Sequence, residues 1–253
     1  MNLPANGGLE KRVPRRAFTV LELLVVLAVV AILASLLFPA LSRSRESAWR
    51  VQCVDHLHQL GLAAQFYWED HDGLTFRYFS GSTNGGRLYW FGWLKPGAEG
   101  EREFDARPGA LYPYLESRGV AICPSFDYSS TIYKYKARGA ATDYGYNLYL
   151  GEHCLSVSLV ACPSDTALFS DAAQVNDFQS PATPEKPLLE EFYYVDADEG
   201  AGYPNAHFRH QHRANVVCCD GHVGQETPVP NSLDSRLPGQ WVGRLRPACL
   251  RLR

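Results

Sequence analysis

The stretch of sequence that decides the architecture runs from residue 18 to residue 38 and is FTVLELLVVLAVVAILASLLF. It contains one charged residue, Glu22, and its length matches the roughly 20 apolar residues that a helix needs to cross a bilayer. The preceding residues are polar and basic, with Lys11, Arg12, Arg15 and Arg16 against a single acid, Glu10. Because positive charge is retained on the cytoplasmic side, the pattern predicts a single-pass helix with a cytoplasmic N-terminus and an exported C-terminal part.

Glu22 needs an explanation, because a carboxylate in the hydrocarbon costs about 2.5–3.5 kcal/mol on insertion scales. Two explanations stay open from this residue alone: a partner within the membrane, or a position close enough to the membrane face to reach water. An ordinary cleaved secretory signal is a weaker alternative. Its apolar core would span roughly 7–15 residues, and no small-x-small cleavage site precedes a polar mature start here.

The surroundings of Glu22 resemble a known signal. The segment RRAFTVLEL, residues 15–23, is similar to the class III signal of type IV pilins and type II secretion pseudopilins. In that family a basic leader ends in a small residue, usually Gly, the next residue is usually Phe, and Glu is fifth in the mature chain. Here Ala17 replaces the usual Gly, Phe18 follows, and Glu22 is at the fifth mature position. Pro39 falls where the family often has a helix-bending proline.

This resemblance implies processing and assembly. A prepilin peptidase would cut after Ala17, and Phe18 would be N-methylated. The chain would lie in the bacterial inner membrane with its head in the periplasm or outside the cell, and other pilin or pseudopilin subunits are the implied partners. In a packed assembly, Glu22 of one subunit would pair with the Phe18 amine of a neighbour, which neutralises two charges that are costly in lipid.

Beyond Pro39 the sequence predicts a helical extension with one apolar face and a stop at Gly73. The apolar positions recur every three or four residues and are Trp49, Cys53, Leu57, Leu60, Ala64 and Tyr67. The predicted organisation is a leader at 1–17, a transmembrane helix at 18–41, an amphipathic extension at 42–72, a β-rich head at 73–230 and a loose polar tail at 231–253.

Aromatic and β-branched runs between turn residues predict that the head is β-rich. Candidate strands are residues 87–93, 120–125, 144–151, 166–171 and 191–195, with long loops at 80–86, 96–109 and 176–188. The clearest hairpin is 214–223, where Asp220-Gly221 favours a type I′ turn. The predicted fold class is α+β, with a long N-terminal helix packed on an antiparallel β-sheet head, as in pilins.

The hairpin completes a second resemblance. His210, nine intervening residues and then Asp220-Gly221 are similar to the H-X9-DG motif of prepilin-processing-associated proteins, which have a pilin-like N-terminus and a β-rich head. With the segments around Cys53, Cys123 and Tyr144, the resemblance spans most of residues 17–224. It implies a class of protein rather than a mechanism.

Two regions of the head offer metal-binding side chains, although we expect no metal and no cofactor. The first contains His207, His210, His212, His222 and Asp220, and imidazole is a common transition-metal ligand, but the spacing fixes no geometry. The second is the acidic segment 196–200, whose oxygens could bind calcium. A structural role or a solvated surface is the favoured interpretation of both. The seven cysteines form no paired CxxC framework, and their pairing cannot be deduced from sequence.

The sequence favours a structural protein over an enzyme. It has no GxSxG elbow, P-loop or HExxH motif, and its net charge of -3 gives no basic surplus for nucleic acid. We predict a pilin-like or pseudopilin subunit of a type IV pilus or type II secretion filament. The alternative is a solitary membrane-anchored module whose head binds a metal or another ligand. An envelope hydrolase is a third class, for which the sequence offers no catalytic constellation.

Overall fold

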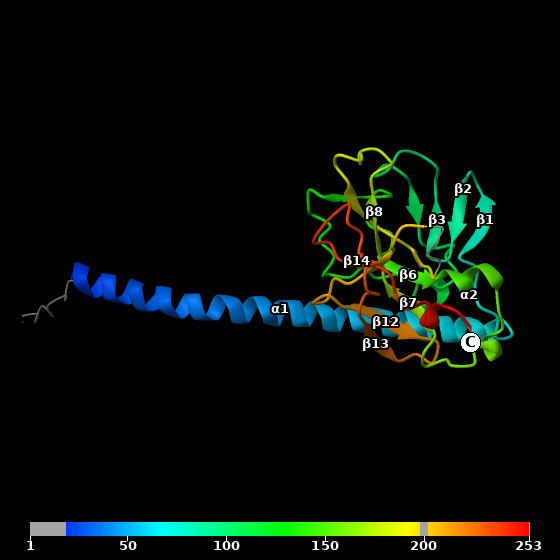
Figure 1. The fold of residues 1–253 in the computed structure, drawn as a ribbon, viewed down its shortest axis with the longest axis horizontal. Helices are drawn as coiled ribbons and strands as arrows, with labels where there is room; N and C mark the ends of the chain where they lie inside the picture. Colours follow the sequence, from blue (N-terminus) through cyan, green and yellow to red (C-terminus); the bar gives the residue numbers. More distant parts are fainter. Residues whose placement is uncertain (1–18, 198–201, 253) are drawn as a thin grey trace, which may run out of the picture. The chain divides into compact units, whose positions relative to one another are not determined.

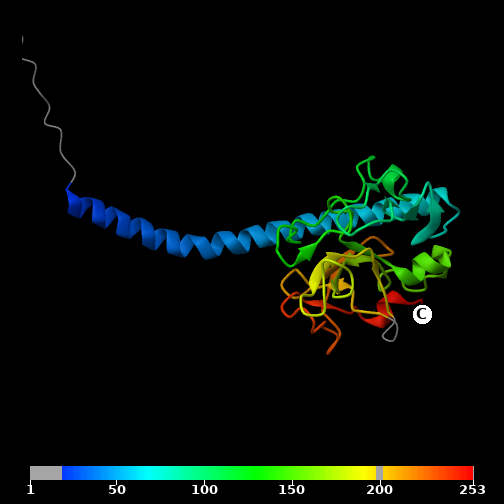
Figure 2. The same cartoon turned by 90° about the horizontal axis from the view of Figure 1, so that it is seen from above.

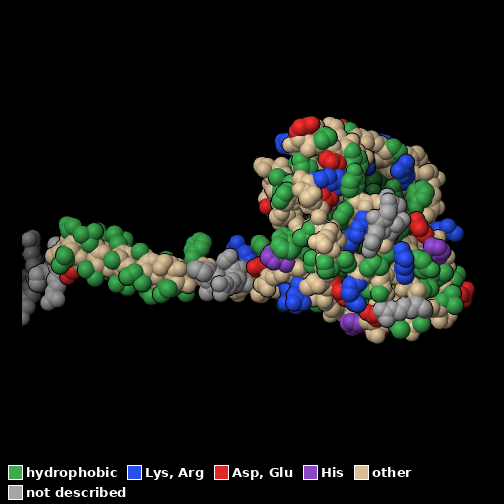
Figure 3. Space-filling view, in the orientation of Figure 1, with side chains coloured by type: hydrophobic (Ala, Val, Ile, Leu, Met, Phe, Trp, Pro, Cys, Tyr) green, Lys and Arg blue, Asp and Glu red, His purple; other side chains and the backbone are tan. Residues whose placement is uncertain are grey.

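The computed structural model describes residues 19–197 and 202–252, and its longest element is the helix α1, Val20–Asp70 (Figure 1). The chain divides into two compact units between Arg45 and Glu46. In the first unit, the 19 residues Val20–Phe38 have a mean hydropathy of 3.0 and none is buried. Hydrophobic side chains cover this part of the helix in Figure 3. By length and composition, the segment is suited to cross a membrane.

α1 begins with a capping box at Thr19 and Glu22. Oε2 of Glu22 accepts hydrogen bonds from the backbone N–H and the hydroxyl of Thr19, each over 2.8 Å. In return, the N–H of Glu22 donates to Oγ1 of Thr19 over 3.2 Å. The first N–H groups of a helix have no partner within it, so this exchange stabilises the start of the apolar segment.

The second half of α1 buries one face in the head. Its buried residues include Cys53, Leu57, Leu60 and Ala64, none of them more than 2% exposed. The predicted apolar face is confirmed at these positions. At its ends the face differs from the prediction. Trp49 is exposed, and Trp68, four residues after Ala64, is buried in place of Tyr67.

The end of α1 is a left-handed turn at Asp72 and Gly73, with φ angles of 53° and 72°. The N–H of Gly73 donates to the carbonyl of Trp68 over 2.8 Å, the hydrogen bond that closes a Schellman motif. The predicted stop at Gly73 is therefore confirmed.

A five-stranded sheet packs against α1, in the order β10-β6-β7-β12-β13. Its strands are β6 (Tyr144–Asn147), β7 (Ala167–Asp171), β10 (Tyr194–Val195), β12 (Ala214–Cys218) and β13 (Val223–Glu226). Neighbouring strands are antiparallel except β10 and β6, which are parallel. Leu57 of the helix shares an apolar cluster with Phe169 and Val217 of the sheet. The predicted α+β class is confirmed.

Three smaller sheets complete the head, which lies along the C-terminal half of α1 in Figures 1 and 2. One contains β1 (Phe79–Thr83), β2 (Gly86–Tyr89), β3 (Gly92–Leu94) and β4 (Phe104–Asp105). Another has the order β5-β9-β8, with β5 (Tyr133–Lys134), β9 (Leu188–Glu191) and β8 (Ala173–Asn176). The last pairs β11 (Ala206–His207) with β14 (Val242–Gly243). The short helices are α2 (Leu148–His153) and α3 (Pro247–Leu250), with 3-10 turns at Tyr112–Tyr114 and Val157–Leu159.

Several strand predictions need correction. The strand at 166–171 is confirmed as β7, but 87–93 forms two strands, β2 and β3, around a tight turn. Gly92 allows this turn: its φ is 151°, and a Cβ there would lie 2.5 Å from the carbonyl oxygen of Asp105. The predicted strand at 144–151 ends at Asn147, whose side chain caps α2. At 191–195 one strand ends and a second, β10, begins.

The prediction of a strand at 120–125 is wrong. These residues are irregular, and Ile122 is 40% exposed. The N–H of Cys123 points to the buried carboxylate of Asp143 instead of a neighbouring strand, 3.1 Å from each oxygen. A side-chain acceptor therefore replaces the strand ladder at this position.

The hairpin at 214–223 is confirmed, but its predicted type I′ turn is wrong. The loop has three residues and is closed by hydrogen bonds from Gly221 N–H to the Cys218 carbonyl and from Cys218 N–H to the His222 carbonyl, both 2.9 Å. Gly221 has a φ of 91°, whereas Asp220 is outside the left-handed region. This is the three-residue hairpin in which a type I turn is followed by a left-handed glycine.

The predicted loose tail at 231–253 is also wrong over its described residues. β14 pairs with β11, and the apolar anchors of this segment are at most 3% exposed: Val242, Leu245, Cys249 and Leu250. Leu245 joins a cluster with Ala167 and Val216 of the five-stranded sheet. Phe169 and Val217 of the same strands belong to the helix-facing cluster. The sheet is thus covered by α1 on one face and by the C-terminal segment on the other.

We predict that Gly61→Leu destabilises the head. A Cβ on Gly61 would lie 2.8 Å from a methyl carbon of Val217, a stiff side chain in β12. Overpacking of this kind should lower the free energy of unfolding by about 1–3 kcal/mol, measured by urea denaturation of the full chain in detergent. Gly202→Ala is the control, because nothing lies within 4 Å of its Cβ position. A Gly61→Leu variant as stable as the wild type would contradict the close packing of α1 on β12.

Candidate functional site

His210 lies where the helix is covalently joined to the head. A disulfide links Cys53 of α1 to Cys123, with the two Cα atoms 5.1 Å apart. The ring of His210 is buried beside this bond, with Nε2 3.6 Å from Sγ of Cys123 and 3.4 Å from Oδ2 of Asp171. The histidine of the H-X9-DG pattern therefore contacts both the disulfide and the end of β7.

A buried charge cluster surrounds His210. Arg209 Nη1 lies 2.9 Å from Oδ2 of Asp143, and Arg209 Nη2 lies 3.3 Å from Oδ1 of Asp171. The guanidinium is also 4.8 Å from the ring centre of Phe126. Both carboxylates are fully buried, and Asp171 also accepts a hydrogen bond from the N–H of Asn215 in β12 over 2.7 Å. One arginine thus pairs with two carboxylates, one just before β6 and one at the end of β7.

The electrostatics of this cluster follow from burial. Desolvation raises the pKa of Asp143 to about 6, although the Arg209 cation opposes that shift. The two carboxylates in turn raise the pKa of Arg209, against desolvation, so the arginine stays charged. Nearby, burial raises the pKa of Glu191 to about 8, against the hydrogen bond that the Ala141 N–H donates to it.

The Asp-Gly end of the pattern contacts α1 at a second point. A Cβ on Gly221 would lie 2.9 Å from Nε2 of Gln65, and a Cβ on Gly61 would lie 3.8 Å from Cα of Gly221. Asp220 accepts hydrogen bonds from the N–H of His222, over 3.1 Å, and from its ring Nδ1, over 2.7 Å, which fixes the turn. His210 and Asp220-Gly221 therefore hold the two ends of β12 against the helix, at Cys53 and at Gly61.

The candidate histidine ligands do not converge. His212 stacks on Trp241 with ring centres 3.6 Å apart, His222 is bound to Asp220 at the surface, and His207 is buried against Phe126. Within the described ranges, the one group of three metal-binding atoms closer than 4.8 Å is Cys53, Cys123 and His210. Its two sulfur atoms are bonded to each other, so they are not available as thiolate ligands. In the acidic segment 196–200, residues 198–200 lie outside the described residues.

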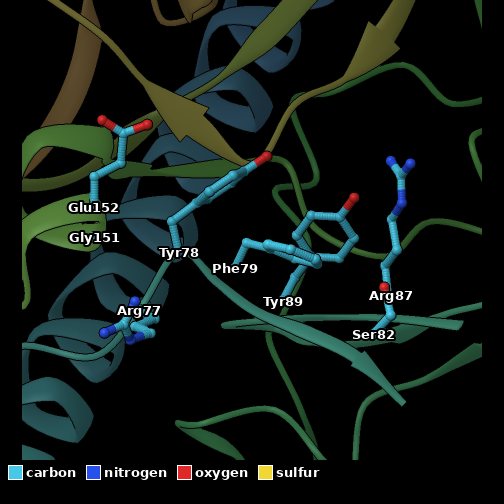
Figure 4. Close-up of a pocket in the computed structure, with 8 residues that line it drawn as sticks. All are labelled: Arg77, Tyr78, Phe79, Ser82, Arg87, Tyr89, Gly151 and Glu152. Atoms are coloured by element: carbon cyan, nitrogen blue, oxygen red, sulfur yellow. The ribbon is translucent and has the colours of Figure 1, made fainter. Parts of the chain in front are cut away.

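A cavity with a volume of about 690 Å³ lies apart from these residues, in the described part of the head. Figure 4 shows the rings of Phe79 and Tyr89 side by side between Arg77 and Arg87, with Glu152 of α2 next to Tyr78. The two ring centres are 5.5 Å apart. A cavity of this size, with aromatic walls and a few charged groups, has the dimensions of small-molecule sites in proteins.

The residues predicted to be processed, Ala17 and Phe18, lie outside the described residues, whereas Glu22 is described as part of the capping box. The buried residues Asp143, Asp171, Arg209 and Glu191 were not predicted. No spacing pattern in the sequence distinguishes them from solvated acids and bases.

Comparison with known families agrees with these features. The model of the prokaryotic N-terminal methylation motif matches residues 12–38, which include Ala17, Phe18 and Glu22. The protein is therefore a pilin-like or pseudopilin-like chain with a prepilin-type signal. The model described as Protein of unknown function (DUF1559) matches residues 42–207, which is more than half of the chain. The chain therefore belongs to this family. Neither a curated protein nor a solved structure matches it.

We predict that Arg209→Met lowers the free energy of unfolding by about 3–5 kcal/mol, because it leaves Asp143 buried without its cation. Arg107→Met is the matched control: Arg107 pairs with Asp105 at the surface, where its side chain is 76% exposed, and its loss should cost about 0–1 kcal/mol. Urea denaturation at pH 7.5 measures both. Equal losses in the two variants would contradict a stabilising role of the buried cluster.

We also predict that Glu191 makes the stability of the head depend on pH. Its pKa of about 8 in the folded state exceeds the ordinary value of 4.5, so the fold binds the proton more tightly than the unfolded chain does. The contribution is complete below pH 4.5 and is lost as the pH rises to about 8. Above pH 7, where Asp143 with its pKa of about 6 is almost fully ionised, the free energy of unfolding should fall by up to about 1.4 kcal/mol per pH unit.

Glu191→Gln should remove this slope between pH 7 and 8, since glutamine keeps the shape of the side chain and does not titrate. Glu69→Gln, at an exposed position of α1, is the control and should leave the slope unchanged. An unchanged slope in Glu191→Gln would mean that another group is responsible.

Proposed function

We propose that this protein is a structural subunit of a pilus-like or pseudopilus-like filament of the type IV pilus or type II secretion kind. The observation that supports it is the match of residues 12–38 to the methylation motif, together with the apolar residues Val20–Phe38 of α1, none of which is buried. A prepilin peptidase would remove the leader after Ala17 and leave a free, methylated amine on Phe18. Helices of neighbouring subunits would then cover the apolar surface.

Glu22 has two roles in this proposal, one in the free subunit and one in the filament. In the free subunit its carboxylate is bound to Thr19. That local partner reduces the cost of holding a charge at the start of the apolar segment, but it does not neutralise the charge. In the filament the Phe18 amine of a neighbour supplies the opposite charge, which favours an axial stagger between subunits.

The proposed topology places the N-terminus in the cytoplasm, one helix in the bacterial inner membrane, and the head in the periplasm or outside. The basic residues before the apolar segment support this orientation. The Cys53–Cys123 disulfide agrees with it, because disulfides persist mainly in oxidising compartments. The partners would be the prepilin peptidase and other pilin or pseudopilin subunits, with no role for nucleic acid.

We further propose that the head is not an enzyme and holds no resident cofactor. Its buried ionic groups are bound to one another: Arg209 holds Asp143 and Asp171, and Glu190 is bound by Lys134 and Lys136. Groups used in this way support the fold rather than face a substrate.

A second candidate is a solitary membrane-anchored module that binds a ligand in its head. The 690 Å³ cavity between Arg77 and Arg87 favours it, because Arg77 has no hydrogen-bond or ion-pair partner within the described part of the chain. Such a module would need neither a free Phe18 amine nor contacts between helices.

A charge-removing substitution separates the two candidates. Glu22→Gln retains the capping interaction, because glutamine also serves in a capping box, but it cannot neutralise an amine. In a filament subunit we expect normal cleavage before Phe18. The amount of cross-linked multimer in membranes should fall by about tenfold or more, which is equivalent to about 1.4 kcal/mol per contact. Glu69→Gln, which removes a carboxylate from the same helix outside the apolar segment, is the control and should assemble as the wild type does.

Intact mass and N-terminal sequencing, from cells with and without the prepilin peptidase, complete the experiment. A chain that begins at methylated Phe18 only when the peptidase is present supports the proposal. A chain that begins at Met1 in both cells contradicts processing, and unchanged multimers in Glu22→Gln would favour the solitary module.

A further inference from the structure

The three-stranded sheet β5-β9-β8 holds a lysine, a glutamate and an asparagine within hydrogen-bond distance of one oxygen atom. Oε2 of Glu190 lies 2.8 Å from Nζ of Lys134 and accepts a hydrogen bond from Nδ2 of Asn176 over 3.0 Å. None of the three residues is more than 4% exposed. We propose that Lys134 and Asn176 form an intramolecular amide cross-link with loss of ammonia, and that Glu190 accepts the proton of the attacking amine.

The strand register creates this arrangement. Glu190 is on the central strand, β9, and pairs directly with Lys134 of the parallel strand β5. On the other side it pairs with Gln174 of β8, and Asn176 lies two residues further along that strand. Because side chains alternate between the faces of a strand, Lys134, Glu190 and Asn176 point to the same face of the sheet. The reacting groups are thus held by three adjacent strands.

The amide of Asn176 is held as an electrophile. Its Oδ1 accepts hydrogen bonds from the backbone N–H groups of Phe178, over 3.1 Å, and of Gln179, over 2.9 Å. Two such donors stabilise the negative charge that forms on a carbonyl oxygen when a nucleophile attacks its carbon. The Nδ2 group, which would leave, is bound to Oε1 of Gln179 over 3.0 Å in addition to Glu190.

The charges of the surrounding cluster favour loss of one cation. Lys134 also lies 3.2 Å from Glu99, Lys136 lies 2.9 Å from Glu190, and Arg102 is paired with Glu99. These ion pairs join three cations to two carboxylates, so the cluster carries a net positive charge while it is largely buried. A buried charge without a counterion is costly. Conversion of the Lys134 ammonium into a neutral amide leaves Lys136 and Arg102 to balance Glu99 and Glu190.

The step is balanced without an oxidant or a further reactant. Oε2 of Glu190 takes one proton from the Lys134 ammonium, and the freed lone pair on Nζ forms a bond to Cγ of Asn176. A second proton moves from Nζ to Nδ2, the Cγ–Nδ2 bond breaks, and ammonia leaves. The ammonia takes the proton held by Glu190 and departs as ammonium, so the carboxylate is regenerated. A cavity of about 260 Å³, lined by Glu99, Lys136 and Gln179 among others, adjoins the site and gives the product a way out.

The first test is the intact mass of the full chain, purified from membranes and reduced. The cross-link predicts a mass lower than that of the processed sequence by about 17 Da, the mass of one ammonia displaced in the acyl transfer. A tryptic digest should show no cleavage after Lys134 and a branched peptide that joins the Lys134 segment to the Asn176 segment. A wild-type mass equal to that of its sequence, with cleavage after Lys134, would overturn the proposal without any variant.

Three variants identify the reacting groups. Lys134→Arg keeps the positive charge but removes the nucleophile, and Glu190→Gln keeps the shape but removes the proton acceptor, so both should lack the ammonia loss. Lys136→Arg is the matched control. Lys136 also contacts Glu190, but it does not attack, and this variant should retain the cross-link.

Ring closure of Asn176 onto its own backbone also releases ammonia, and the same variants separate the two reactions. Ring closure would survive in Lys134→Arg and would give no branched peptide, an outcome that overturns the cross-link. Loss of ammonia in Lys134→Arg but not in Lys136→Arg would likewise refute Lys134 as the nucleophile. The test does not involve processing or assembly, so its result is independent of the proposed filament.

Discussion

The packing of β12 on the second half of α1 is the constraint on which the head depends. Cys53 and Gly61 are two turns apart on one face of the helix, and they lie at the two ends of β12. The disulfide of Cys53 contacts His210, just before β12 begins. Gly61 contacts Val217 and Gly221, near the end of β12. A single helix can thus be apolar on all sides in its first half and on one side in its second, because its surroundings change along its length. The nine-residue spacing of the H-X9-DG pattern matches these two contact points.

A sheet covered on both faces has no solvated side to accept charged side chains, and this explains the buried ionic groups of the head. Asp143 lies just before β6, and Asp171 is the last residue of β7. Both residues are beyond the apolar cluster but are still buried. Arg209 supplies the charge, and backbone N–H groups of Cys123 and Asn215 complete the hydrogen bonding of the carboxylates. The network therefore connects loops that are not joined by strand pairing. It fixes one arrangement of segments that have no regular structure.

The sequence predicts those features whose physical cause is local. The length of the apolar run predicts the helix that is suited to cross a membrane. The period of the apolar residues that follow predicts the buried face from Cys53 to Ala64. The Thr-x-x-Glu pattern at residues 19–22 is also a local signal, which would have identified the capping box. The errors are of another kind. Residues 231–253 look polar because the apolar residues that bind them to the five-stranded sheet are few and scattered, among them Leu245, Cys249 and Leu250. Residues 120–125 have the composition of a strand but meet the carboxylate of Asp143. Pairing of Cys53 with Cys123, across 70 residues, depends on the tertiary fold alone.

In the proposed filament subunit, the capping box at Glu22 bears on the step from the free subunit to the assembly. In the isolated helix, Thr19 supplies two hydrogen bonds to the carboxylate but no charge. An amine from a neighbouring chain adds a full opposite charge in a medium of low dielectric constant, where the attraction is much larger than in water. The carboxylate has acceptor capacity left, because it can accept about four hydrogen bonds and Thr19 uses two. Local capping and intersubunit pairing are therefore compatible, and the helix start can remain ordered while the subunit changes partners.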